Sequence, residues 1–382
     1  MLEHDFTPEQ LELQASIRAF TDRAVRPGYL ARARDDSYPE EIVRALAEEK
    51  LLGLRYPTEI GGRALDETSV GIVLEELAKG DMNVALLTFF MGGGRMGGGM
   101  PPELGEQLAK QIIAGEVMTA AGITEPQGGS DVASIQTTAV LDGDEYVVNG
   151  EKISVGMAAW SKYASVLCRV GDGDGYRGLA SVFVDLDQPG VTRHRIRDMG
   201  SGIVGRGGLR FEDVRTPASW LLQPQGQGFV QTMKGFDVAR VLVSLMALGC
   251  AEASLDDAVE YARQREVFGK RIGNYQAIAF RLAEDATYVE AMRGMAYRTL
   301  SLADRGIPHT TESSMCKWWI PLTSQQICHR SLLTFGHYGY NDDNPVQQRY
   351  RDVVGLEIGD GTAEIQKLVV SRRLLGKEFR PS

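Results

Sequence analysis

Residues 122–131 combine hydroxyl groups with unhindered backbone amides. Thr124 and Ser130 supply the hydroxyls, and Gly128 and Gly129 let a ligand approach the main chain closely. Such a loop can bind a phosphate-containing cofactor through hydroxyl and amide donors. Taken alone, the same composition is also typical of an ordinary glycine-rich turn.

A second glycine-rich stretch runs from Gly92 to Gly99. A phosphate-binding P-loop needs a preceding strand and a Gly-Lys-Ser/Thr ending, and this stretch has neither. It follows Phe89, Phe90 and Met91. We therefore interpret it as a flexible link whose glycines leave room for a substrate beside these side chains.

Metal sites and disulfides are not expected. The four cysteines show no CxxC spacing, and the five histidines form no HxH or HxxxH pair. This cysteine usage fits a reduced, cytoplasmic protein. The first residues lack the basic and apolar segments of a signal peptide, and the most apolar stretch, Val241 to Ala251, is too short to span a bilayer.

The net charge of −10 argues against a nucleic-acid binder, because such a protein needs a basic surface. We predict neither nucleic-acid binding nor membrane insertion. A few local arginines and backbone amides can still hold the phosphates of a cofactor.

The surrounding patterns divide the chain into three domains. Residues 1–117 are mainly amphipathic helix, residues 118–226 alternate short apolar runs with turns, and residues 227–382 return to long helical patterns. The middle region predicts a small antiparallel barrel or sandwich, and the last region a four-helix bundle. The expected strands are 137–141, 145–148, 179–184, 191–196 and 209–214.

Several motifs, in order, resemble those of the acyl-CoA dehydrogenase family. Residues 122–131 match a family signature built on Thr-Glu and Gly-Ser-Asp, and residues 261–276 are close to its YAxxRxxFGxxIxxxQ pattern. Residues 361–366, Gly-Thr-Ala-Glu-Ile-Gln, follow its C-terminal motif. The resemblance extends over nearly the whole chain; further matching segments are 57–62, 75–78, 211–214, 336–340 and 349–352.

The resemblance implies the acyl-CoA dehydrogenase fold: an N-terminal all-α domain, a central β-barrel and a C-terminal four-helix bundle. It also implies FAD, bound between the β domain and the bundle and shared across a subunit interface, and hence a homotetramer or dimer. The cofactor residues it implies are Ile123, Thr124, Gly129, Ser130, Ser154, Gly156, Leu333, Gly336, Thr362 and Glu364, with Arg265, Phe268 and Gln276 reaching a neighbour's FAD. Arg265 could instead form a surface salt bridge.

In this family a carboxylate removes a proton next to the thioester carbonyl, and flavin N5 takes a hydride from the following carbon. The resemblance places this base at Asp360, directly before Gly361, where the family usually has Glu. Asp is one methylene shorter, so the substrate or the backbone must lie closer. Asp360 could alternatively only cap the following helix. Glu364, one helical turn later, is the reserve candidate for the base.

The chain departs from the family at further positions. Gly359 stands where an aromatic residue is common, and Leu333 where a Gln touches FAD. Ser154 and Gly156 occupy the positions of a Trp and a Thr that flank the flavin. Trp160, a few residues later, is a candidate to fill the gap left by the missing Trp.

The implied substrate is an acyl-CoA or acyl-carrier-protein thioester, and the implied electron acceptor is an electron-transfer flavoprotein. The expected substrate contacts are Phe89, Phe90, Ser130, Arg240, Gly359 and Gly361. For Arg240, a charge on a helix surface is almost as good an interpretation. Three alternatives stay open: a biosynthetic dehydrogenase of carrier-bound or cyclic acids, a flavin oxidase resembling nitroalkane oxidase, and a catalytically inactive thioester-binding protein.

Overall fold

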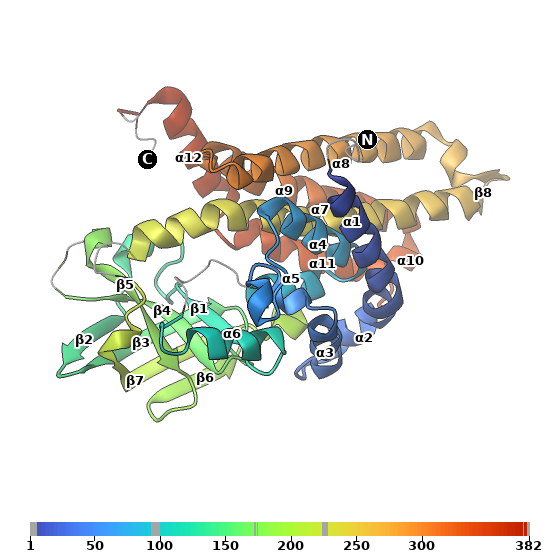
Figure 1. The fold of residues 1–382 in the computed structure, drawn as a ribbon. Helices are drawn as coiled ribbons and strands as arrows, with labels where there is room; N and C mark the ends of the chain where they lie inside the picture. Colours follow the sequence, from blue (N-terminus) through green and yellow to red (C-terminus); the bar gives the residue numbers. More distant parts are fainter. Residues whose placement is uncertain are drawn as a thin grey trace.

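The computed structural model describes residues 6–92, 100–171, 173, 175–223, 228–376 and 378–379. The chain forms a helical N-terminal part, a β-sheet part and a long helical bundle, in that order (Figure 1). Residues 93–99, most of the glycine run that we interpreted as room for a substrate, lie outside the described residues.

The N-terminal part consists of α1 (Pro8–Phe20), α2 (Tyr29–Arg34), α3 (Glu40–Glu48), α4 (Glu67–Gly80), α5 (Met82–Met91) and α6 (Gly105–Ile113). Helix α1 begins with a capping box between Thr7 and Gln10. Asp81 ends α4 and caps α5, because its carboxylate accepts the Asn83 N–H at 2.9 Å. Helices α4 and α5 are mostly buried, and α4 packs along the bundle.

The middle part is a single hydrogen-bonded sheet of seven strands: β1 (Thr119–Gly122), β2 (Thr138–Asp142), β3 (Glu145–Val155), β4 (Tyr163–Arg169), β5 (Leu179–Asp185), β6 (Val191–Arg195) and β7 (Gly207–Pro217). The expected strands 137–141 and 145–148 are confirmed and form a hairpin, since Asp142 pairs with Glu145 around Gly143. We predicted an antiparallel sheet. The prediction is wrong in part, because β1 runs parallel to β4. Neither β1 nor β4 was among the predicted strands.

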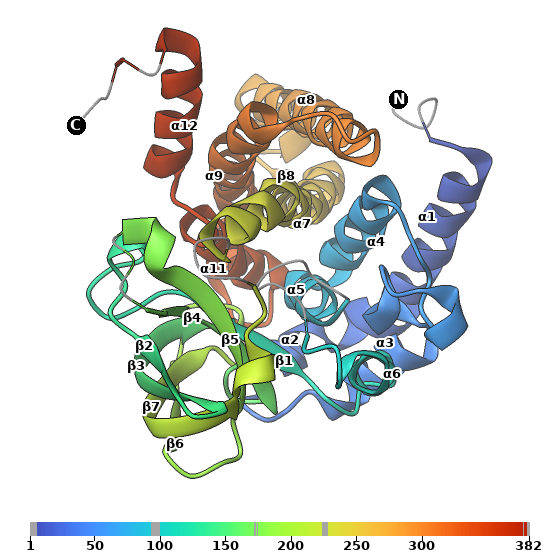
Figure 2. The ribbon, with the colours of Figure 1, turned by 60° about the vertical axis from the view of Figure 1, so that its left-hand side comes forward.

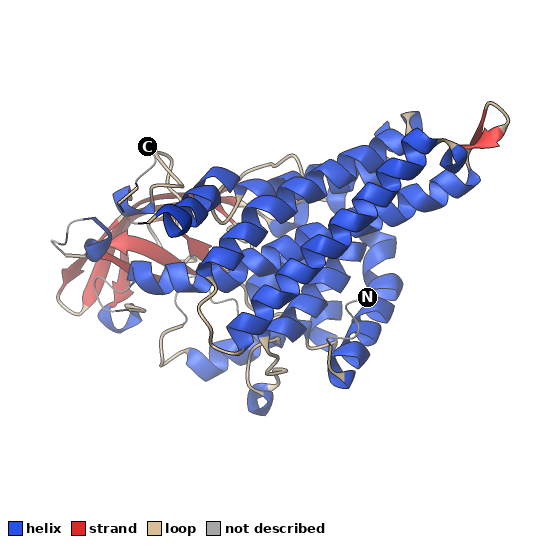
Figure 3. Cartoon of the chain, turned by 90° about the horizontal axis from the view of Figure 1, so that it is seen from above, coloured by secondary structure: helices blue, strands red, loops and turns tan. Residues whose placement is uncertain are grey.

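The predicted four-helix bundle is confirmed. It consists of α7 (Gly228–Gln264), α8 (Gln276–Asp304), α9 (Thr310–Phe335) and α11 (Pro345–Ile358), with α7 in contact with the other three. The hairpin of β8 (Glu266–Val267) and β9 (Lys270–Arg271) lies at the end of the bundle far from the sheet (Figure 3). After the short α10 (His337–Tyr340), α12 (Ala363–Leu375) contacts α9 and extends past the bundle (Figure 2).

Within α7, the segment Gly235–Gln264 is long and apolar enough to cross a membrane, a longer stretch than the sequence suggested. However, 89% of its most apolar window is buried inside the protein. The central position of α7 among α4, α8, α9 and α11 accounts for this composition, because every face of the helix meets apolar neighbours.

A buried carboxylate joins the three parts of the chain. Asp352 in α11 accepts hydrogen bonds from the Tyr29 hydroxyl at 2.7 Å, the Asn83 amide at 3.1 Å and the Ser201 N–H at 2.9 Å. These donors come from α2, from α5 and from the loop before β7. The sheet is thereby held at a fixed position against both helical parts.

Candidate active site

Asp360 lies in the loop between α11 and α12. Its backbone is in the left-handed region, with φ +57°, and Gly361 follows at φ +92°. Helix α12 is capped by Thr362, whose hydroxyl accepts the Ile365 N–H at 3.5 Å. The interpretation of Asp360 as only the cap of this helix is therefore wrong, and its carboxylate is available for another role.

Three cations act electrostatically on the partly exposed Asp360 side chain. Burial raises the pKa of Asp360, and Lys317, Arg240 and Arg206 act in the opposite direction. The cations come from α9, from α7 and from the residue preceding β7. A carboxylate whose pKa is raised by burial is a stronger base than an exposed aspartate, which suits it to proton abstraction.

Arg240 is not a surface charge, which excludes one of its two interpretations and leaves the substrate contact as a prediction. It is 9% exposed, its Nε donates to the Asp360 carbonyl at 3.3 Å, and its Nη1 donates to Asp237 Oδ1 at 3.2 Å. Asp237 also accepts the Thr310 hydroxyl at 2.6 Å. Burial lowers the pKa of Arg240, and these acidic neighbours offset part of that effect.

The loop that carries Thr124 is held by a buried ion pair. Lys152 is fully buried, and its Nζ donates to Glu125 Oε1 at 2.7 Å and to the Ile123 carbonyl at 3.1 Å. Burial raises the pKa of Glu125, but hydrogen bonds from Lys152, from Thr137 and from the Gln136 N–H outweigh it and lower the pKa to about 2. Sequence reasoning missed this pair. The detectable signal was a lysine at an inward-facing position of β3.

Ser154 and Gly156 lie beside side chains from outside β3. Arg206 Nη1 donates to Ser154 Oγ at 3.3 Å, and a Cβ added to Gly156 would lie 3.0 Å from the Phe90 ring. Trp160 Nε1 donates to the Ile203 carbonyl at 3.1 Å. Arg206 and Phe90 thus lie beside Ser154 and Gly156, the positions at which the family's Trp and Thr are missing.

Phe89 and Phe90, both expected near the substrate, differ in environment. Phe89 is 3% exposed and belongs to the apolar core, whereas Phe90 is partly exposed and reaches Gly156.

Two further predicted substrate contacts, Ser130 and Gly359, are exposed. Glu364 is also exposed on α12, so it has less of the desolvated environment that a base requires than Asp360 has.

The remaining predicted cofactor residues lie at the opposite end of the bundle. The hairpin and its surroundings carry Arg265, Phe268 and Gln276, all exposed, and Phe268 is 95% exposed (Figures 1 and 3). Arg265 lies 6.0 Å from the centre of the Tyr338 ring instead of forming a salt bridge within the described part of the chain. Leu333 and Gly336, at the end of α9, are exposed near the same place. One chain thus holds the predicted cofactor residues in two separate groups.

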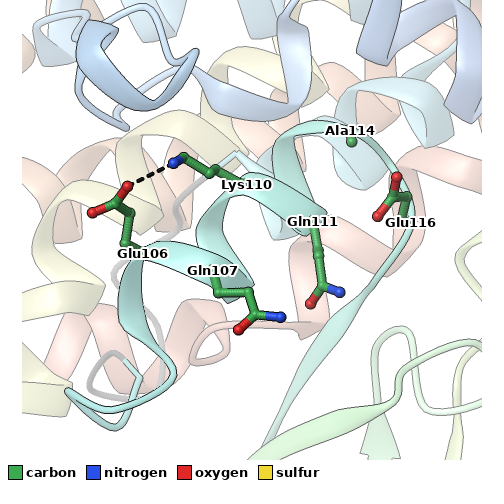
Figure 4. Close-up of a pocket in the computed structure, with 6 residues that line it drawn as sticks. All are labelled: Glu106, Gln107, Lys110, Gln111, Ala114 and Glu116. Atoms are coloured by element: carbon green, nitrogen blue, oxygen red, sulfur yellow. Dashed lines mark hydrogen bonds and ion pairs between the residues drawn. The ribbon is translucent and has the colours of Figure 1, made fainter.

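Two open hollows lie elsewhere on the surface. One of about 580 Å³ follows α6 and is lined by Glu106, Gln107, Lys110, Gln111, Ala114 and Glu116 (Figure 4). The second, of about 510 Å³, includes Tyr38 and Trp160. Neither is lined by Asp360, and of the residues considered for the cofactor site only Trp160 lines one of them.

The described residues contain no group of three His, Cys, Asp or Glu side chains placed to hold a metal ion. All four cysteines are buried, and each is a free thiol.

Comparison with known proteins covers almost the whole chain. Family models for the acyl-CoA dehydrogenase N-terminal, middle and C-terminal domains match residues 7–116, 120–214 and 226–375. The caffeyl-CoA reductase-Etf complex subunit CarC of Acetobacterium woodii is 32% identical over 97% of this chain and 100% of its own length. A cyclohexane-1-carbonyl-CoA dehydrogenase of Syntrophus aciditrophicus is 34% identical, over 96% of this chain and 97% of its own.

The fold agrees with these relationships. Butyryl-CoA dehydrogenase from Megasphaera elsdenii superposes with a TM-score of 0.90 at 29% identity, covering 97% of this chain and 99% of that structure. Sequence, order of domains and fold thus lead to the same assignment. The chain belongs to the acyl-CoA dehydrogenase family, whose members are FAD-dependent oxidoreductases.

Proposed function

We propose that this protein oxidises the Cα–Cβ bond of an acyl thioester, with Asp360 as the base that removes the α-proton. The observation that carries the proposal is the environment of Asp360. Its carboxylate lies on a loop of left-handed backbone, its pKa is raised by burial, and Lys317, Arg240 and Arg206 face it. A group in this environment can hold a proton briefly and release it again near neutral pH.

The residues of the β part fit a bound FAD. Thr124 is partly exposed, Ser130 is exposed, and no other atom lies within 4 Å of the position of a Cβ at Gly128, so hydroxyls and main chain are open to a ligand. When bound, the flavin would supply the hydride acceptor. The ion pair of Glu125 and Lys152 would keep the Thr124 loop in place for it.

A homo-oligomer is part of the proposal. The second group of predicted cofactor residues lies far from the β part of its own chain, so only another subunit could bring it to the first group. Monomers rarely expose many large apolar side chains close together. The end of the bundle at the hairpin exposes Phe268, Leu333, Tyr338 and Tyr340.

An electron-transfer flavoprotein is the acceptor that we propose, because the relative from Acetobacterium woodii is named as a subunit of an Etf complex. For the acyl group, a cyclic acid is a specific candidate. One relative is named for a cyclohexane acid, and the exposed Gly359 has no side chain to fill the space beside Asp360.

Anaerobic bleaching of the bound flavin tests the proposal. The FAD-loaded protein is mixed with straight-chain, branched and cyclic acyl-CoA thioesters and with carrier-protein thioesters of the same acids. We expect at least one thioester to bleach the flavin and the free acids to leave it oxidised. Bleaching by a nitroalkane, or peroxide release without an added acceptor, would assign an oxidase instead. Bleaching by none of these compounds would indicate a binding protein.

A further inference from the structure

Lys317 is a buried cation outside the predicted site. It lies about two turns into α9 and is 1% exposed, so its ammonium group has lost nearly all of its water. Burying a charge is unfavourable unless partners replace the lost hydration. The partners of Lys317 therefore indicate what the residue is for.

The hydrogen-bond partners of Lys317 flank Asp360, one at the end of α11 and one in the loop that follows it. Its Nζ donates to the Glu357 carbonyl at 3.3 Å and to the Gly361 carbonyl at 3.3 Å. The Gly361 carbonyl also accepts the Gln366 side-chain amide at 3.3 Å. Lys317 thus joins the end of α11 to the residue that follows Asp360, and so spans the turn on which the carboxylate is carried.

This turn needs external support, because its backbone is unfavourable for an ordinary residue. Asp360 has φ +57°, in a region that L-residues other than Asn and Asp seldom occupy. Arg240 holds the Asp360 carbonyl, and Lys317 holds the carbonyls on either side of the turn. With a side chain as short as Asp, small shifts of this backbone move the carboxylate out of reach of the substrate.

Lys317 is also one of three cations that act on the Asp360 carboxylate. The groups that face the carboxylate are Lys317 from α9, Arg240 from α7 and Arg206 from the β part, and Glu357 from α11 also acts on Lys317. Burial lowers the pKa of Lys317 to about 8 and raises the pKa of Asp360. Burial thus disfavours both charges, so each charged form depends on the presence of the other.

We propose that Lys317 is a positioning residue for the base: it fixes the turn that presents Asp360 and supplies the charge that keeps its carboxylate ionised. The inference rests on the proposed function, because it assumes that Asp360 removes the proton. It assigns a role in the reaction to a residue that was not among the predicted substrate or cofactor contacts.

The test is the pH dependence of anaerobic flavin reduction by the best thioester, measured for Lys317→Met, Lys317→Arg and the wild type. Loss of a positive charge beside a carboxylate raises the carboxylate's pKa, so we expect the acid limb of the Lys317→Met profile to lie about 1 to 3 pH units higher. Lys317→Arg keeps the charge, and its limb should stay within about half a pH unit of the wild type.

Lys79→Met is the matched control. Lys79 is also largely buried and ion-paired, with Glu76 at 2.9 Å and Glu252 at 3.0 Å, but it lies on α4 among acids that do not face Asp360. Its acid limb should stay in place, while thermal unfolding of all variants reports folding independently of activity. If Lys317→Met does not fold, Lys317→Gln also removes the charge while keeping a donor for the two carbonyls.

The outcomes separate the two proposals. An acid limb that stays in place in both neutral variants, with folding intact, would overturn the role of Lys317 and leave the dehydrogenase assignment unaffected. A wild-type flavin that no thioester bleaches would instead overturn the proposed function. An upward shift in Lys317→Met, absent from Lys317→Arg and Lys79→Met, supports the inference.

Discussion

At the scale of single residues, the proposed site departs from the family resemblance at the proposed base. Asp replaces the usual Glu at position 360, and the backbone beneath it adopts a conformation that Asp tolerates better than most residues. The shorter side chain and the left-handed turn are therefore compatible with each other. A base here depends on the accuracy of the turn more than a longer, flexible carboxylate would.

Asp360→Asn is the first prediction. The amide keeps the size of the side chain but cannot accept the substrate proton, so flavin reduction by thioester should fall about 10²- to 10⁴-fold. Bound FAD, measured by absorbance, should be unchanged, because the residues predicted to hold it are intact. Glu364→Gln is the control. If that variant loses reduction while Asp360→Asn keeps it, the base is Glu364.

At the scale of elements, the loop after β1 depends on one ion pair. Lys152→Met leaves the carboxylate of Glu125, which is 3% exposed, without its cation, so we expect a loss of about 3–5 kcal/mol in the free energy of unfolding. Urea unfolding measures this loss. The double variant Glu125→Leu/Lys152→Met should recover part of it, because neither charge then remains buried. An unchanged stability in Lys152→Met would contradict the assigned role of the pair.

The same pair predicts how stability depends on pH. The pKa of Glu125 in the folded protein is about 2, below its ordinary value of 4.5. Its contribution is therefore complete above about pH 4.5 and is lost as the pH falls toward 2. Thermal unfolding across this window should show a steeper loss of stability in the wild type than in the double variant without Glu125.

The sequence predicts the local elements better than their pairing. The hairpin at Gly143 follows from a two-residue turn between alternating strands, and the bundle from long helical periodicity. The parallel pairing of β1 with β4 was missed, because it joins residues more than forty positions apart and leaves no local signal. For the same reason, Asp360 could be predicted from the sequence as a site residue, whereas Lys317 and Arg206 could not. Their positions near Asp360 depend on how α9 and the β part pack against the loop that carries it.

At the scale of the whole molecule, Asp352 couples the three parts of the chain. Asp352→Ala leaves the Tyr29 hydroxyl, the Asn83 amide and the Ser201 N–H without this acceptor. We expect the free energy of unfolding to fall by at least about 3 kcal/mol. Calorimetry should show a lower or divided transition. Asp343→Ala, at an exposed ion pair with Arg34, should leave the transition unchanged.

Phe268→Ala tests the shared cofactor site. The ring is 95% exposed, so its removal should not lower the stability of the single chain. If a neighbour's FAD contacts this ring, the variant should lose bound FAD and assemble less well, as absorbance and light scattering would show. Full retention of FAD and of the assembly would contradict the sharing.

The distance between the hairpin and the β part has a consequence for how the enzyme responds to its own abundance. If one subunit completes the cofactor site of another, each holoenzyme site requires an encounter between two chains. Flavin loading then follows mass action, rising with protein concentration even when FAD is in excess. A dilute preparation would lose its flavin through dissociation alone, without any chain unfolding, and would regain it on concentration.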